Sequence, residues 1–267
     1  MARLALALML ATLAAVPARA EPVPDLCSGE AIITGRENLD ERARGVRLAL
    51  LQVLVKVSGD DRIAEHPEIP RILADAETLM LGYEYEDRKK GIQISDEQGT
   101  RDRSFHFRAA FDRDHVQAVL DRLGLNPWDA DRPRLLVALA VTDHAGPFIL
   151  GTEVGRGAGQ RETLLMDARR RGIPLVLPKM DSVETLAVSY REVASVSGMA
   201  VGALATAYGA DAVLVGTMAI TSDGYWDTDW TLLADGMPIH WSVPAATFDR
   251  AIGEGLGRTA RVLASLP

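Results

Sequence analysis

Cysteine is nearly absent from this chain of 267 residues, in which Cys27 is the only one. A single thiol cannot form an internal disulfide, and it cannot build a zinc site from clustered cysteines. Pro24-Asp25-Leu26 precedes Cys27 in place of the small residues that precede a lipoprotein cysteine, so a lipid anchor is not expected. We interpret Cys27 as a free thiol near the N-terminus.

A surplus of positive charge is also missing. The chain has 29 basic and 37 acidic side chains and a formal net charge of −8. Residues 1–20 contain Arg3 and Arg19 and no acidic residue, so their removal leaves a charge of about −10. Such a chain has no general electrostatic attraction for nucleic acid or anionic lipid, although this balance leaves room for a local basic patch.

Long apolar runs are missing after residue 20, and none approaches the roughly 20 residues of a transmembrane helix. At the start, an apolar run over 4–16 follows Arg3 and precedes the small-x-small pattern Ala18-Arg19-Ala20. This pattern is typical of a secretory signal peptide over residues 1–20. We therefore expect cleavage after Ala20 and a soluble exported chain that begins with an extended leader over 21–29.

Catalytic and cofactor motifs are missing as well. The sequence has no Gly-x-Ser-x-Gly elbow, and the glycine cluster between residues 151 and 159 lacks the Lys-Ser/Thr of a P-loop. No histidine has the i, i+4 partner of a helical zinc site. We predict no catalytic residue, no metal and no cofactor.

Periodic segments are present and divide into two units. Residues 30–125 read as a first α/β unit in the order β-α-α-β-β-β-α, and residues 126–133, with two prolines, read as a linker. The expected elements are a strand at 30–34, a helix at 39–57 that begins after Asn38 and ends at Gly59, a second helix to Leu79, strands at 83–87, 91–95 and 103–111, and a helix that ends at Gly124.

Residues 134–267 form the second predicted α/β unit, organised around a helix that stops at Gly209 and a doubly buried strand that begins at Ala212. The other expected elements are a strand at 135–141, a glycine-rich loop at 142–159, a helix at 160–171, a strand at 175–177, a broken helix at 181–197, a hairpin of strands at 225–233 and 237–243, and a helix at 246–263. The fold class is α/β (α+β), with two small layered units and mixed sheets.

Two clusters allow a structural and a functional interpretation. In the hairpin, alternation places Asp227 and Asp229 on one face, which we interpret as an exposed polar face, with a cation or sugar site as the alternative. We expect Trp226, Trp230 and Trp241 to fill the core beneath the last helix, with a binding groove as the alternative. Arg169-Arg170-Arg171 ends a helix, where it complements the macrodipole without any ligand.

The partner surface that we predict is the mobile loop 142–159 together with residues 216–221, because ligands of open α/β sheets meet the carboxyl ends of parallel strands. A solvent-exposed insertion without a partner is the alternative. The residues expected to contact a partner are His144, Phe148, Glu153, Arg156, Gly216 and Thr221.

Several motifs resemble those of an exported bacterial family of unknown function, DUF2066. They are Leu51-Gln-Val-Leu-Val-Lys-Val-Ser-Gly59, Gly124-Leu125 with Pro127-Trp128, Arg132-Pro133, Ala210-Asp-Ala-Val-Leu-Val-Gly216 and Trp230-Thr-Leu232. The resemblance implies a location in the Gram-negative periplasm and no activity.

Residues 210–218 are also similar to a strand in envelope-assembly proteins, namely the N-terminal domain of the Tol propeller protein, the curli secretion lipoprotein and the flagellar T-ring proteins. This fold-level resemblance implies a non-enzymatic accessory or scaffold protein that binds a protein of the cell envelope. A periplasmic small-ligand-binding protein and a hydrolase remain the alternatives.

Overall fold

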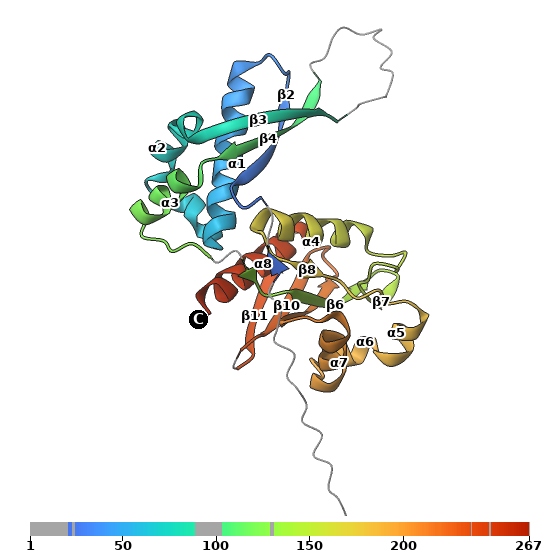
Figure 1. The fold of residues 1–267 in the computed structure, drawn as a ribbon. Coiled ribbons are helices and arrows are strands. Elements are labelled where there is room, and N and C mark those ends of the chain that lie inside the picture. The colour runs from blue at the N-terminus through green and yellow to red at the C-terminus, as the bar shows by residue number, and fades with distance from the viewer. Residues whose placement is uncertain are drawn as a thin grey trace, which may run out of the picture.

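The computed structural model describes residues 21–22, 25–88, 103–128, 131–235, 237–245 and 247–266. The predicted signal peptide 1–20 and the predicted strand 91–95 lie outside these residues. The described part combines helices with two larger mixed or antiparallel sheets, so the predicted α/β class is confirmed (Figure 1).

The first sheet has the order β2-β4-β3 and is antiparallel throughout. Its strands are β2 (Ser28–Thr34), β3 (Met80–Asp87) and β4 (Ser104–Phe111). The alternation predicted in the last of these is confirmed, because Phe107 and Phe111 are buried while His106 and Arg108 are exposed. One face of the sheet therefore packs on helices, and the other face stays open.

Helix α1 (Leu39–Ser58) covers the packed face, as the sequence predicts. Its first turn is capped by Asn38, whose Oδ1 accepts the main-chain N–H groups of Asp40 and Glu41 at 3.1 and 3.2 Å. The helix ends at Gly59, which has φ of +72° and packs so closely on Trp128 that a Cβ atom would lie 3.0 Å from its ring. A fully buried stripe, which includes Val46, Leu50, Val53 and Leu54, faces the sheet.

The predicted second helix is broken in the structure. It consists of α2 (Ile69–Ala74) and the 3-10 turn η2 (Ala76–Leu79), after an earlier 3-10 turn η1 (Asp61–Glu65). The Thr78 hydroxyl and N–H both donate to the Asp75 carbonyl, at 2.7 and 3.0 Å, which tightens the chain into a 3-10 turn. Helix α3 (Arg113–Arg122) completes this region.

The second sheet has the order β11-β10-β9-β6-β7, with β8 pairing β6 beside β7. Its strands are β6 (Leu135–Asp143), β7 (Gly146–Ile149), β8 (Leu175–Val176), β9 (Ala212–Ile220), β10 (Trp226–Leu233) and β11 (Ile239–Ala245). Strands β6 and β9 are parallel neighbours, and β10 and β11 form the predicted antiparallel hairpin.

Helices cover both faces of this sheet (Figure 1). On the side toward the first sheet lie α4 (Ala158–Arg171) and α8 (Phe248–Ser265). On the opposite side lie α5 (Ser182–Ala187), α6 (Tyr190–Ala194) and α7 (Gly198–Tyr208). The central helix and strand are confirmed, because α7 stops at Gly209 with φ of +57° and β9 is buried on both faces.

The three tryptophans of the hairpin belong to the core beneath α8, as predicted. Trp226, Trp230 and Trp241 are all buried in the same apolar cluster, and Trp230 is fully inaccessible. Its ring occupies the space above Gly216, where a Cβ atom would lie 2.5 Å from it. Glycine is needed at this position because the ring takes the volume of a side chain.

The predicted linker is described at residues 126–128 and 131–133, and these include buried side chains. Strand β5 (Asp131–Arg132) pairs there with β1 (Glu21–Pro22), and both Trp128 and Arg132 are buried. The buried apolar residues 33–123 form one cluster and those of 128–263 form two. The division of the chain into units at 30–125 and 134–267 stays a prediction.

Arg132 holds the ends of two helices together. Its guanidinium donates to the carbonyl of Lys56 at 2.7 Å and to those of Arg171 and Gly172 at 3.0 and 2.9 Å, and it lies 4.0 Å above the Trp128 ring. Burial lowers the pKa of Arg132 to about 10, which leaves it charged at neutral pH. A cation at the carboxyl ends of α1 and α4 complements both helix dipoles.

Candidate functional site

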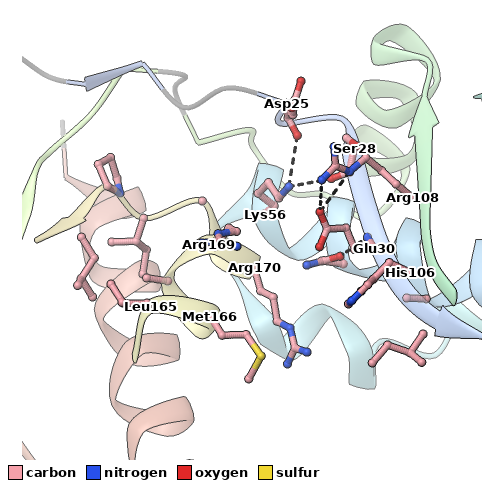
Figure 2. Close-up of a pocket in the computed structure, with 18 residues that line it drawn as sticks. Asp25, Ser28, Glu30, Lys56, His106, Arg108, Leu165, Met166, Arg169 and Arg170 are labelled. Atoms are coloured by element: carbon pink, nitrogen blue, oxygen red, sulfur yellow. Dashed lines mark hydrogen bonds and ion pairs between the residues drawn. The ribbon is translucent and has the colours of Figure 1, made fainter. Parts of the chain in front are cut away.

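A groove of about 660 Å³ lies between the open face of the first sheet and helix α4, and we call it the inter-unit groove (Figure 2). One wall consists of residues from β2, β4 and α1, and the other consists of residues from α4 and the segment that follows it. The side chains that define it are Glu30, Ile32, Gln52, Lys56, His106 and Arg108 on the first wall, and Leu165, Met166, Arg169, Arg170, Ile173 and Leu175 on the second.

Apolar side chains on both walls are open to solvent. Leu165 and Met166 are 39% and 41% exposed on α4, and Ile32 is 46% exposed on the open face of the sheet. Figure 2 shows Leu165 and Met166 on the side opposite His106 and Arg108. Single exposed apolar residues are ordinary on protein surfaces, but their convergence on one groove is typical of a binding site.

Charged residues surround these apolar side chains. Arg108 is held by Glu30 at 2.7 Å and by Glu84 at 3.4 Å, and its pKa is raised by the hydrogen bond to Glu30. Arg170 has a long contact of 3.8 Å with Asp167, and Arg169 has no ion pair or hydrogen bond from its side chain within the described ranges. The guanidinium of Arg108 is therefore neutralised by carboxylates, whereas those of Arg169 and Arg170 are available to a ligand.

Lys56 lies at the base of the groove and is almost completely buried. Its Nζ donates to the Ser28 carbonyl at 2.7 Å and to the Asp25 carbonyl at 3.3 Å. Desolvation by burial lowers the pKa of Lys56. Because its hydrogen bonds join the last turn of α1 to β2, its role in this geometry is to build the wall of the groove.

The edge of β2 that adjoins the groove is blocked by α1. Residues 28, 30, 32 and 34 alternate along the strand, so their main-chain groups point away from β4. Four side chains of α1 bind these groups. Lys56 donates to the Ser28 carbonyl, and Arg44 donates to the Ile32 carbonyl at 2.8 Å. Gln52 accepts the Glu30 N–H at 2.6 Å, and Glu41 accepts the Thr34 N–H at 3.0 Å. Such cover prevents another strand from pairing with this edge.

The partner surface predicted from the sequence lies elsewhere. The register pairs Thr142 with Ala219, so the loop after β6 and the turn after β9 do meet at the same edge of the second sheet. His144 and Glu153 are exposed there, and Thr221 is half-buried in the turn, where its N–H donates to the Tyr225 carbonyl at 2.8 Å. Whether a partner binds this edge stays a prediction.

Three of the predicted contact residues, Phe148, Arg156 and Gly216, have structural partners of their own. Arg156 lies 4.3 Å above the Phe148 ring and binds both Asp143 and the Gly146 carbonyl. Gly216 is buried beneath Trp230 in the middle of β9, and it therefore offers no surface to a partner. Gly216 is therefore wrong as a predicted contact residue, because its lack of a side chain makes room for the Trp230 ring in the core.

The segment 142–159 is not the continuous loop expected from its glycines. Residues 146–149 form β7, and Arg161 donates to the carbonyls of Gly151 and Val154 at 2.7 and 3.1 Å. A Cβ atom at Gly151 would lie 2.6 Å from the Lys179 carbonyl oxygen. This glycine allows a close approach of two backbones, so the glycine content reflects packing as well as flexibility.

The aspartates of the hairpin lie on its exposed face, as predicted. Asp229 accepts a hydrogen bond from Ser242 and lies 4.0 Å from His240, while Asp227 is exposed. Among the residues that the structure describes, no group of three or more acidic, histidine or cysteine side chains has the geometry of a metal site. The polar-face interpretation agrees with this arrangement.

The sequence reasoning missed the inter-unit groove. It assigned Arg169-Arg170-Arg171 to the helix dipole, but only Arg171 is tied to a neighbouring element, through Asp61 at 3.5 Å and the Gly253 carbonyl at 3.1 Å. The sequence did contain one signal of this groove, because Leu164, Leu165 and Met166 are consecutive. A helix that covers a sheet needs apolar residues on one face only, and three in a row place some of them on another face.

Comparison with known proteins identifies a domain but no activity. A family model described as a domain of unknown function, DUF8605, matches residues 20–129. The match agrees with the expected domain of unknown function but not with DUF2066, the family that the motifs suggested. No curated protein matches the chain significantly. Of the helices described, none has the length and apolar character required to span a bilayer.

Proposed function

We propose that this protein is exported to the periplasm, where it binds a protein partner of the cell envelope as a non-enzymatic accessory or scaffold protein. The observation that carries the proposal is the inter-unit groove, in which Ile32, Leu165 and Met166 are exposed between two packed bodies. Association would remove these side chains from water, which favours binding by about 25 cal/mol for each Å² of apolar surface.

Two further observations support a role in binding. The walls of the groove are tied together, because Arg132 joins α1 to α4 and Asp61 binds Arg171 and Arg261. A preformed surface loses less conformational entropy on association than a flexible one. Export is supported by the apolar run over 4–16 and by Ala18-Arg19-Ala20.

Site-directed photo-crosslinking tests the binding role. A photoreactive phenylalanine analogue replaces Met166 in the groove, and the matched control replaces Met199, which is exposed on α7 at the opposite side of the second sheet. In cells that produce the protein, we expect a discrete protein adduct from position 166 and none of the same mass from position 199. Identical adducts from both positions, or none from position 166, would contradict the proposal.

Mass spectrometry of the mature N-terminus tests export. We expect the periplasmic fraction to contain a chain that begins at Glu21. Recovery of intact Met1 from that fraction would contradict cleavage.

A small-ligand-binding function is the second candidate, and the volume of the groove favours it. Small-molecule sites generally occupy about 300–1,000 Å³, and this groove falls within that range. A thermal-shift screen with periplasmic metabolites separates the two candidates. A metabolite that stabilises the wild-type chain but not a variant with Leu165→Asp and Met166→Asp would favour this alternative.

A further inference from the structure

The inter-unit groove is basic although the chain as a whole is acidic. Four side chains that line it are cationic, from α1, β4 and α4, whereas only Asp25 and Glu30 are anionic. The complete chain has a formal net charge of −8. The residues that line the groove therefore have an excess of positive charge, which favours an anionic ligand.

We propose that the inter-unit groove binds an acidic peptide segment of a partner protein, with Arg169 and Arg170 binding its carboxylates and Leu165 and Met166 receiving an apolar side chain. This inference rests on the proposed function and names the chemistry of the bound segment.

Among the four cations, Arg169 and Arg170 are the ones available to a ligand. Arg108 is engaged by two carboxylates, and Lys56 uses its ammonium group to hold main-chain carbonyls. Arg170 keeps only its 3.8 Å contact with Asp167, and its side chain is exposed. A guanidinium can bind a carboxylate with two parallel hydrogen bonds, so these two arginines suit Asp or Glu side chains.

The apolar residues lie within one helical turn of these arginines. Leu165 and Arg169 are four residues apart on α4, as are Met166 and Arg170, so each pair shares a face of the helix. Figure 2 shows Met166 and Arg170 extending into the space between α4 and the first sheet. A segment that pairs an apolar side chain with a nearby carboxylate matches this spacing.

At the β2 wall of the groove, a segment can bind only through side chains. A peptide could add to a sheet only at a free strand edge, and the edge of β2 beside the groove is occupied by Glu41, Arg44, Gln52 and Lys56. Affinity therefore depends on charge and apolar contacts, and it falls as salt screens the arginines.

Selection from a random peptide display library tests this inference with the full chain from Glu21 as bait. We expect the enriched peptides to combine Asp or Glu with a Leu, Ile, Met or Phe two to four positions away. Binding of a synthesised winner is then measured by fluorescence anisotropy. We expect Arg169→Glu with Arg170→Glu to weaken it by about tenfold or more, and Arg169→Gln with Arg170→Gln to weaken it less.

The matched control changes two exposed arginines outside the groove. Arg71→Glu with Arg191→Glu alters the net charge of the chain as much as the groove variant does, but on α2 and α6. We expect it to change the dissociation constant less than twofold. Equal weakening by both charge-reversed variants would overturn the inference, because attraction would then depend on total charge.

Other outcomes separate this inference from the proposed function. Enrichment of basic or neutral peptides, or unchanged affinity in the groove variant, overturns the acidic segment. If the photoreactive group at position 166 still gives a discrete protein adduct, the protein-binding function stands. The selection could also enrich no peptide, while the protein binds phosphatidylglycerol vesicles and the same groove variant abolishes that binding. This result would overturn the acidic-peptide inference in favour of an anionic lipid surface.

Discussion

Replacing Arg132 by methionine removes the cation that joins α1 to α4 while keeping a side chain of similar length. The guanidinium donates to three main-chain carbonyls, those of Lys56, Arg171 and Gly172. A hydrogen bond to a charged group contributes about 1.5–3 kcal/mol, so the gross contribution is about 4.5–9 kcal/mol. Burial of the guanidinium costs several kcal/mol and offsets part of this gain.

We therefore expect Arg132→Met to lower the free energy of unfolding by about 3–5 kcal/mol, because three main-chain carbonyls each lose a hydrogen bond while the cost of burying the charge is removed. A typical domain is stable by about 5–15 kcal/mol, so this loss is large. Arg132→Lys should recover only part of it, because one ammonium group cannot present the planar fork that reaches three carbonyls.

Urea unfolding followed by tryptophan fluorescence and by far-ultraviolet circular dichroism measures the effect. Trp128 lies directly beneath Arg132 and reports on the joint, whereas Trp230 reports on the core of the second sheet. The control is Arg191→Met, at an exposed position on α6. If Arg132→Met unfolds within about 0.5 kcal/mol of this control, the guanidinium does not stabilise the joint.

Three further predictions follow from the packing. Leu54→Ala on the buried stripe of α1 should cost about 2–5 kcal/mol in urea unfolding, whereas Leu48→Ala, at an exposed position of the same helix, should cost less than about 0.5 kcal/mol; equal losses would show that the stripe is not core. Gly216→Ala should destabilise the fold by about 1–3 kcal/mol, because the new Cβ meets Trp230. Gly202→Ala, at an exposed position of α7 with open space around it, should raise the melting temperature. A stabilising Gly216→Ala and a destabilising Gly202→Ala would contradict the packing. The pKa of Glu41 is lowered to about 2 by its hydrogen bonds with Arg44 and the Thr34 N–H, so Glu41 stabilises the fold above pH 4.5 and loses this effect as the pH falls toward 2. The difference in melting temperature between wild type and Glu41→Gln should therefore shrink over that interval. A constant difference would refute the assignment.

The sequence by itself determined the elements that depend on neighbouring residues. Asn38, the apolar spacing after it and Gly59 predicted α1, and the alternation of β4 predicted which side chains face the core. The central helix and strand around Gly209 were predicted in the same way. These patterns can be read directly because capping and the periodicities of helices and strands involve residues only a few positions apart.

Tertiary structure decided the candidate site. Arg169 and Arg170 have the same local sequence context as Arg171, yet Arg171 binds Asp61, which lies 110 positions earlier in the chain, and the other two line the inter-unit groove. Arg132 lies in a polar linker motif of the sequence, yet it is buried in the structure. It is buried because it binds carbonyls at the ends of α1 and α4, two helices from different parts of the chain. Burial and charge pairing of these residues depend on how distant elements pack together, and no local spacing in the sequence encodes that arrangement.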